Sequence, residues 1–349
     1  MDKNNNSVSD DIQKLKAKLE TSNLPEDLKD KIQISIIRLE RMSALRSYSS
    51  DYEVTSKYID TLTQIPWGIK TADNLDINNA KRILDQNHFG MNDIKERVLE
   101  YLASMHFNTE QGAPILCFVG LQGIGKTTIA KSISEALGRN FERISLGGVS
   151  SVLEIRGQSK VNPDAEPGYI IKSIIRAKSM NPVILLDEFD KISDEGGVRS
   201  AIMATFLEIL DPEQNGDFTD HYIDYPIDLS NVMFILTANN LGTISSALLD
   251  RLEIIRFTSY TDEEKLKIAI DYLMPKVYRS IGLNKEQFQI DENVFPDIIR
   301  PLGYEAGIRE LERILMGMGR KAAKKILVEN IKSVKIDSSN LKNFLPIGY

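Results

Sequence analysis

The sequence has 349 residues, of which 42% are hydrophobic and 27% are charged; this ordinary globular composition excludes a wholly disordered chain and suggests two or three domains. Forty-three basic and 50 acidic residues give a net charge of -7, which argues against a protein whose main affinity comes from a basic surface. A single cysteine excludes an internal disulfide framework, three histidines argue against a Cys/His zinc site, and no apolar run reaches the roughly 20 residues of a membrane span.

The N-terminal part is predicted to be a helical arm. Its first residues are polar and acidic, unlike a secretory signal, so we expect a reducing compartment such as the cytoplasm or an organelle matrix. Residues 12–20 and Tyr52–Leu62 have helical patterns. Between them, a further helix is predicted by apolar residues at steps of four, four and three: Leu28, Ile32, Ile36 and Leu39. We place this arm at residues 1–72.

Residues 73–258 are predicted to form a large α/β domain. Residues 73–106 have helical periodicity with a break at His88-Phe89-Gly90, and beyond Pro114 short apolar runs alternate with helical patterns. Such alternation is typical of a mostly parallel sheet buried on both faces. The predicted strands are Ile115–Val119, Arg143–Leu146, Val183–Leu186 and Val232–Thr237.

The remaining segment, residues 259–349, is predicted to form a small all-α domain. Its pattern becomes helical again at Thr261, which is followed by three acidic residues in a first helical turn. Threonine is a favoured N-cap, and acidic side chains stabilise the positive end of a helix.

One segment fits a phosphate-binding pattern. Gly120–Thr127 matches G-x-x-x-x-G-K-[ST], follows a predicted strand and precedes the helical stretch Thr128–Leu137. Glycines let backbone N–H groups of such a loop face phosphate oxygens, and the helix N-terminus adds positive potential. Lys126 can reach the β- and γ-phosphates, and the Thr127 hydroxyl can ligate Mg²⁺. The expected nucleotide-binding residues are Gly120, Gly123, Ile124, Gly125, Lys126, Thr127 and Thr128.

Polar side chains end two other predicted strands. Val183–Leu186 is followed by Asp187 and Glu188, at the edge where α/β sheets bind ligands. We expect Asp187 to hold Mg²⁺, mostly through water, and Glu188 to polarise the attacking water. Asn239 follows the strand ending at Thr237 and could orient that water, although asparagine is also common in simple turns.

At this point the sequence resembles AAA+ ATPases, which combine these motifs with a strand that ends in asparagine. Longer stretches are similar to the ATPase module of the Lon protease family in particular. These stretches are Ile65-Pro66-Trp67, Arg143–Val149, Glu154–Gly157, Leu210–Asn215, Asp220–Tyr222 and Leu248–Arg251. The resemblance runs from the helical arm to nearly the last residue. It implies an AAA+ P-loop NTPase fold with a helical lid, and binding of ATP or ADP with Mg²⁺.

The resemblance also implies roles for residues that spacing alone does not single out. Arg251 matches the arginine finger that reaches a neighbouring subunit's nucleotide; the alternative is an ordinary surface arginine beside Asp250. Arg309 matches the lid arginine that senses the γ-phosphate in its own subunit; the alternative is a helix surface pair with a glutamate. Phe89 and Gly90 match the stretch that flanks the adenine; the alternative is packing in a helix break.

Two departures from the family pattern matter. Lon proteins carry a Ser-Lys protease domain after the ATPase module, and this sequence ends at Tyr349 where that domain would begin, so no peptidase activity is expected from it. Between Gly157 and Pro167 the family has an aromatic and an aliphatic residue that grip a threaded polypeptide. By spacing, these positions are Asn162 and Pro163 here, and Tyr169 lies beyond the loop at a predicted helix start.

Three functional hypotheses follow. The first is a Lon-type motor module in a homo-hexameric ring that couples ATP hydrolysis to unfolding and movement of protein substrates. The second is a regulatory or decoy subunit that assembles with a complete Lon subunit or a separate protease and uses ATP as a switch. The third, a nucleic-acid-remodelling AAA+ protein, has less support because the chain is acidic and lacks a basic-aromatic stripe.

Overall fold

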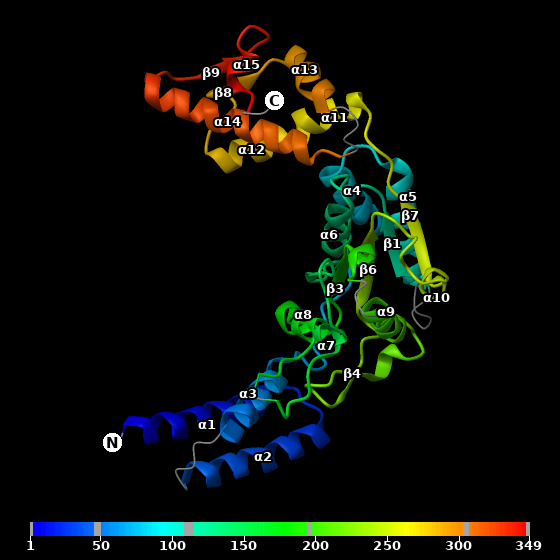
Figure 1. Ribbon diagram of the computed structural model, residues 1–349, viewed down its shortest axis with the longest axis vertical. Coiled ribbons are helices and arrows are strands. Elements are labelled where there is room, and N and C mark those ends of the chain that lie inside the picture. The colour runs from blue at the N-terminus through cyan, green and yellow to red at the C-terminus, as the bar shows by residue number, and fades with distance from the viewer. Residues whose placement is uncertain are drawn as a thin grey trace.

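The computed structural model describes residues 3–44, 50–107, 115–162, 164–193, 197–302 and 307–346, and the statements below concern these residues. The chain extends along one long axis in three parts (Figure 1). Three helices lie at one end, a sheet with its covering helices lies in the middle, and a mostly helical lid lies at the other end. Among the described helices, none is long and apolar enough to cross a membrane.

The middle part is built on a five-stranded parallel sheet in the order β2-β3-β6-β1-β7. The strands are β1 Ile115–Val119, β2 Phe141–Ser145, β3 Val183–Asp187, β6 Met233–Ala238 and β7 Leu252–Arg256. The first four correspond to the predicted strands. Strand β7 was not predicted; it is an edge strand that is only partly buried, so its residues lack a continuous apolar run.

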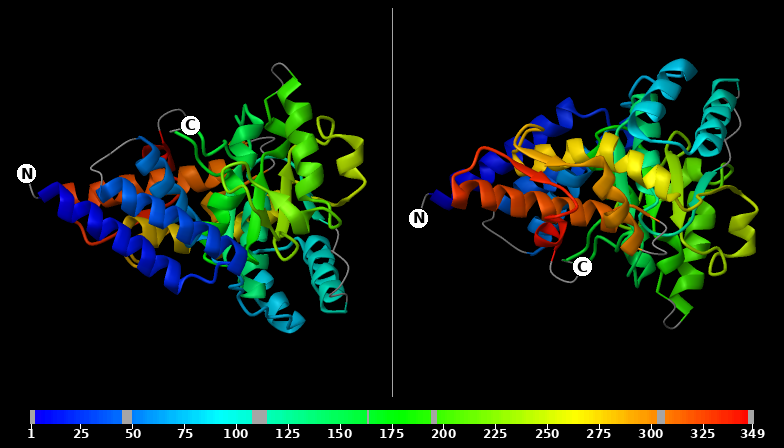
Figure 2. Two further views of the ribbon diagram at one scale, coloured as in Figure 1. Left: turned by 90° about the horizontal axis from the view of Figure 1, so that it is seen from below. Right: turned by 90° about the horizontal axis from the view of Figure 1, so that it is seen from above.

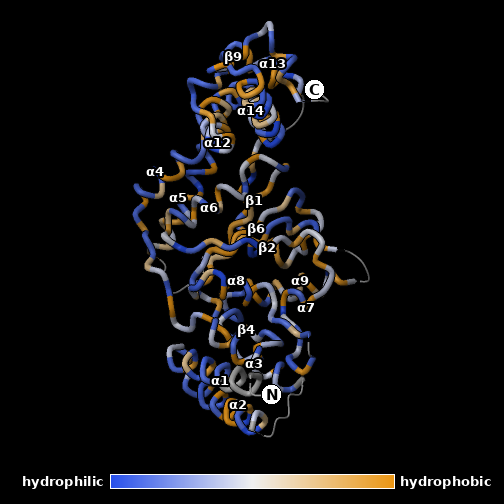
Figure 3. Tube along the Cα trace, turned by 90° about the vertical axis from the view of Figure 1, so that its left-hand side faces the viewer, coloured by the Kyte–Doolittle hydropathy of each residue, from blue (hydrophilic) through white to orange (hydrophobic). Residues whose placement is uncertain are grey.

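Helices cover both faces of this sheet. Successive residues of a strand point to opposite faces, and in β1 the side chains of Leu116 and Phe118 join one core while Cys117 and Val119 join another. The first core includes helices α4 Ile77–Asn87, α5 Asn92–Phe107 and α6 Lys126–Leu137. The second includes α7 Val152–Arg156, α8 Tyr169–Ala177, α9 Val198–Ile209 and α10 Ser246–Leu249. Figure 3 shows the hydrophobic strands running through the middle part.

The arm consists of α1 Lys3–Thr21, α2 Glu26–Ala44 and α3 Ser50–Gln64, which pack against one another (Figures 1 and 2). The four residues of the predicted apolar stripe in α2 are all buried. Their core continues into the core beneath the sheet, where Leu62 and Trp67 belong to the same buried cluster as Ile170 and Phe206. A short antiparallel pair of strands, β4 Phe218–Thr219 and β5 Pro226–Ile227, contributes Phe218 and Ile227 to the same cluster.

The lid is mostly helical, as predicted, and has its own hydrophobic core. Its helices are α11 Asp262–Ile268, α12 Met274–Ile281, α13 Phe295–Ile299, α14 Arg309–Glu329 and α15 Leu341–Phe344. Thr261 caps α11 as expected, in a capping box with Glu264. One short parallel pair, β8 Phe288–Ile290 and β9 Val334–Ile336, was not predicted. The boundaries between arm, large domain and lid at residues 72 and 258 stay predictions.

Candidate functional site

The loop between β1 and α6 has the backbone that phosphate binding requires. Gly123 and Gly125 have φ angles of +82° and +99°, in the left-handed region that residues with a Cβ rarely adopt. Gly125 is the N-cap of α6, so the N-terminal end of this helix opens toward the loop. The loop therefore combines close-approaching backbone with the positive end of a helix.

Lys126 lies at the centre of this site and is 9% exposed. Its Nζ donates to the carbonyl oxygens of Gly120 and Leu121, and to Oδ1 of Asn239 at 2.9 Å. Burial lowers the pKa of Lys126, and the nearby carboxylate of Asp187 acts in the opposite direction. The amine is thus held between the glycine loop and the end of β6, where a phosphate oxygen could replace a carbonyl partner.

Asp187 is the last residue of β3, and its carboxylate is bound on both sides. One oxygen accepts a hydrogen bond from the hydroxyl of Thr237 on the neighbouring strand β6. The other accepts from the Arg143 guanidinium on strand β2, with Nε at 2.7 Å and Nη2 at 2.6 Å. Both guanidinium nitrogens contact the same oxygen, Oδ2, so each carboxylate oxygen has a partner of its own, Thr237 for Oδ1 and Arg143 for Oδ2.

Glu188 follows Asp187 directly and has a φ of +59°. Its backbone N–H donates to the Thr237 hydroxyl at 3.0 Å. Its carboxylate accepts from Lys191 at 2.6 Å and lies 3.5 Å from the side-chain nitrogen of Gln122 in the phosphate loop. It also lies against Gly147, where an added Cβ would come within 2.6 Å of Oε2. Glu188 therefore faces the loop that carries Lys126.

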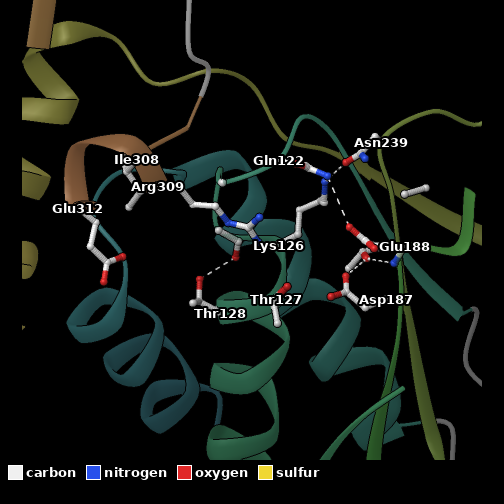
Figure 4. A pocket seen from close by; sticks show the side chains of 14 residues that line it. Gln122, Lys126, Thr127, Thr128, Asp187, Glu188, Asn239, Ile308, Arg309 and Glu312 are labelled. Carbon is white, nitrogen blue, oxygen red and sulfur yellow. Dashed lines mark hydrogen bonds between the residues drawn. The ribbon is translucent and has the colours of Figure 1, made fainter. Parts of the chain in front are cut away.

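The lid contributes the remaining side of the site. The N–H of Ile308 donates to the carbonyl of Gly123 at 3.1 Å, and Arg309 begins α14 directly after it. Gly307 approaches the loop so closely that an added Cβ would lie 2.5 Å from the Gly123 backbone. Figure 4 shows Lys126 between Arg309 on the lid side and Asn239 and Glu188 on the sheet side.

These residues line one cavity of about 170 Å³. The residues predicted from the sequence that line it are Gly123, Gly125, Lys126, Thr127, Thr128, Asp187, Glu188, Asn239 and Arg309. Gln122, Thr237 and Glu312 also line it and were not predicted. Gly120 and Ile124 do not line it but belong to the same loop, in which the Tyr260 hydroxyl donates to the carbonyl of Ile124 at 3.1 Å.

Three other predicted residues lie outside this cavity. Arg251 donates to Oδ2 of Asp211 at 3.0 Å and is partly exposed. Phe89 packs against the lid core with Lys267 5.4 Å from its ring centroid, and Gly90 lies against Glu264 at the start of α11. Their predicted roles, in a neighbouring subunit and beside the adenine, stay predictions.

A magnesium ion fits the chemistry of the cavity. The Thr127 hydroxyl and the Asp187 carboxylate supply oxygen donors, which Mg²⁺ prefers, and both residues line the cavity. Over the part of the chain that the structure describes, no group of three or more His, Cys, Asp or Glu residues could hold a metal. An ion at this site would therefore depend on oxygen atoms of the nucleotide and water for its other ligands.

The loop predicted to face a threaded chain is a small hairpin-like loop, closed at its base by a backbone hydrogen bond and without a strand in its described residues. The N–H of Gln158 donates to the carbonyl of Glu166 at 3.1 Å, and Asn162 is exposed near the tip beside Val161, which is 82% exposed. Lys160 anchors this hairpin-like loop to the arm, with its Nζ 4.4 Å from the ring centroid of Tyr58. Pro163 lies outside the described residues.

Tyr169, the aromatic residue closest to this hairpin-like loop in sequence, is the first residue of α8. Its hydroxyl donates to the carboxylate of Glu154 at 2.8 Å. It therefore belongs to the helix that follows the loop, as its position after Pro167-Gly168 predicted.

Comparison with known proteins agrees with this geometry. Residues 116–260 match the family described as "ATPase family associated with various cellular activities (AAA)". Residues 279–334 match the family described as "Lon protease AAA+ ATPase lid domain".

Relatives that match along most of the chain are Lon proteases. The chain is 45% identical to the Lon protease of Endomicrobium trichonymphae over 97% of its residues, and 44% identical to Lon protease 1 of Bacillus subtilis over 96%. It is 46% identical to the Lon protease of Dictyoglomus thermophilum over 90%. The matched regions cover only 42%, 43% and 39% of these three relatives. The resemblance to the Lon ATPase module that the sequence indicated is confirmed.

Proposed function

We propose that this chain, which matches the AAA family and the Lon protease AAA+ ATPase lid family, binds ATP and Mg²⁺ and hydrolyses ATP in the cavity around Lys126. The observation that carries this proposal is the convergence of Lys126, Glu188, Asn239 and Arg309 from four separate segments of the chain in one cavity. A fixed ammonium, a carboxylate, an amide and a guanidinium are the groups that phosphoryl transfer to water uses.

Each residue has a distinct role in this proposal. Lys126 binds the β- and γ-phosphates, and Thr127 and Asp187 would hold a Mg²⁺ ion, which would supply further positive charge beside the phosphates. Glu188 accepts a proton from the attacking water, and Asn239 orients that water. Arg309 closes the lid side over the γ-phosphate. Since Ile308 is bonded to the phosphate loop, movement of the lid and occupation of the loop would be linked.

We further propose that the module works in a homo-hexameric ring on protein substrates, in the cytoplasm or a comparable reducing compartment. Support for an assembly comes from Arg251, which lies outside the cavity of its own chain and is partly exposed. A guanidinium in this position can serve a neighbouring subunit. In this proposal the hairpin-like loop at 158–166 contacts the polypeptide and transmits force to it. The loop lies next to the arm, where Lys160 contacts Tyr58.

The second candidate function is a regulatory subunit that assembles with a complete Lon subunit or a separate protease. The observation that favours it is the exposed, polar Asn162 where the family has an aromatic side chain. An amide offers less apolar contact area to a threaded chain than a tyrosine does. The complete set around Lys126 favours the hydrolytic motor instead. Nucleic-acid remodelling stays the least supported alternative, because the net charge is -7.

The test separates nucleotide binding from hydrolysis. Lys126→Ala should abolish tight ATP binding, because the phosphates lose a fixed positive partner. Glu188→Gln should keep binding but lower hydrolysis by roughly 10²-fold or more, since the proton acceptor is lost. Isothermal titration and phosphate release measure the two effects. Lys131→Ala, which removes an exposed lysine from the same helix α6, is the matched control and should change neither.

Unchanged ATP affinity in Lys126→Ala would refute the phosphate site. Full hydrolysis in Glu188→Gln would refute the assignment of the general base, whatever the result for Lys126.

A further inference from the structure

Thr237 makes two hydrogen bonds that join the acidic residues of the site. It lies near the end of β6, is 1% exposed and borders the cavity. Its hydroxyl donates to Oδ1 of Asp187 and accepts from the backbone N–H of Glu188 at 3.0 Å. The direction of both bonds follows from the chemistry of the partners. The ionised carboxylate can only accept, so the hydroxyl donates its one hydrogen to it, and the backbone N–H can only donate, so the hydroxyl oxygen accepts from it.

The bond to Glu188 acts on an unfavourable backbone conformation. Glu188 has φ +59° and ψ +43°, in the left-handed region that is costly for a residue with a Cβ. Such a conformation persists only where surrounding contacts hold it. The described contacts on the Glu188 backbone are its N–H bond to Thr237 and the bond from the Lys191 N–H to its carbonyl. This conformation directs the carboxylate toward Gln122 and the phosphate loop.

Asp187 depends less on Thr237 than Glu188 does. Its second carboxylate oxygen, Oδ2, is held by two nitrogens of the Arg143 guanidinium. Loss of the Thr237 hydroxyl would therefore leave Asp187 with a strong partner, while the Glu188 N–H would lose its acceptor. The effect should fall on the residue that activates water rather than on the one that holds the metal.

We propose that Thr237 is a positioning residue for ATP hydrolysis, whose hydroxyl holds the backbone of Glu188 so that its carboxylate faces the attacking water. The inference rests on the proposed function, because it assigns Glu188 to proton transfer. Asn239, the residue directly after β6, accepts a hydrogen bond from Lys126. Strand β6 would thus set the positions of both the phosphate-binding lysine and the general base.

The test uses two substitutions that differ by the hydroxyl. Thr237→Val keeps the shape and the β-branch but removes both hydrogen bonds, and Thr237→Ser keeps the hydroxyl. The valine variant should lower the single-turnover hydrolysis rate about tenfold or more, and the serine variant should stay within about threefold of the parent chain. ATP affinity, measured separately, should change less than about threefold in both variants, because Lys126 keeps its partners and Asp187 keeps its ion pair with Arg143.

A matched control and a double variant isolate the mechanism. Thr205→Val removes another buried threonine hydroxyl, one that bonds to the carbonyl of Ala201 within α9, and should leave the hydrolysis rate unchanged. In a Glu188→Gln background, adding Thr237→Val should cause little further loss, because the residue it positions is already inactive.

An unchanged rate in Thr237→Val would overturn the proposal, as would failure of serine to restore the rate in a chain that melts like the parent. Equal losses from Thr237→Val with and without Glu188→Gln would also overturn it, by showing that Thr237 acts elsewhere. Full activity of Glu188→Gln alone would instead refute the general base assigned in the proposed function, so the two failures are distinguishable.

Discussion

His88 should make the stability of this protein depend on pH. The residue ends α4 just before Phe89 and Gly90, and it is 6% exposed. Its Nε2 lies 2.9 Å from the hydroxyl of Ser132 on α6, and its carbonyl accepts from the buried ammonium of Lys95 at 2.7 Å. Burial, with a contribution from Lys95, lowers the pKa of His88 to about 4. The folded protein therefore favours the neutral imidazole.

The size and sign of the effect follow from linkage. A histidine in the unfolded chain has a pKa of about 6.5, so it takes up a proton at a pH where folded His88 stays neutral. The stabilising contribution is complete above pH 6.5 and is lost as the pH falls toward 4. Each pKa unit corresponds to about 1.4 kcal/mol, which gives a loss of about 2 kcal/mol in the free energy of unfolding between pH 7.5 and pH 5.

Two measurements check this prediction. The chain has three histidines, so imidazole NMR signals can be assigned with single substitutions, and the His88 imidazole should be only about one-tenth protonated at pH 5. In urea unfolding, His88→Gln should reduce the loss of stability between pH 7.5 and pH 5 by about 2 kcal/mol. His221→Gln, at an exposed histidine, is the control and should leave that loss unchanged. A His88 signal that titrates near pH 6.5 would refute the reasoning.

Two further predictions concern the proposed assembly and motor. Arg251→Ala and Lys126→Ala should each be inactive alone but regain some ATPase activity when mixed, because each variant supplies the residue that the other lacks. Arginine fingers contribute about 10³–10⁵ in rate. A specific activity that stays constant down to a demonstrated monomer would contradict a role of Arg251 in a neighbouring subunit. Asn162→Tyr combined with Pro163→Ile should raise the amount of tagged model substrate unfolded per ATP with little change in basal ATPase rate, because the loop gains apolar contact area; efficient unfolding by the parent chain would show that another residue grips the substrate.

The sequence predicted the parts of the fold and site that depend on local patterns. The glycine loop before Lys126, the buried strand before Asp187 and the apolar stripe of α2 each have a signal within a few residues, and each is found where expected. Strand β7 gave no such signal, because it is a partly exposed edge strand in which Glu253 and Arg256 interrupt the apolar residues.

Contacts between distant segments could not be predicted in the same way. Arg143 meets Asp187 because β2 pairs with β3 in a register that sets Ser145 opposite Asp187. Thr237 meets Glu188 because β6 lies beside β3 and because Glu188 adopts a left-handed backbone. Neither a strand register nor a φ angle of this kind is encoded in residue spacing. For the contact between Thr237 and Glu188, the sequence offered one signal, which is the threonine directly before Ala238 and Asn239.

The shared core of arm and sheet bears on how this chain can be shortened. Helix α3 and the segment after it supply Ile59, Leu62 and Trp67 to the same buried cluster as Phe206, and the Met180 N–H bonds to the carbonyl of Ile69 at 2.7 Å. Truncation at residue 72 would uncover apolar surface beneath the sheet and leave a backbone donor without its acceptor. A fragment meant to keep the fold of the sheet should therefore retain α3 and the segment after it, so the arm supports the large domain as well as extending from it.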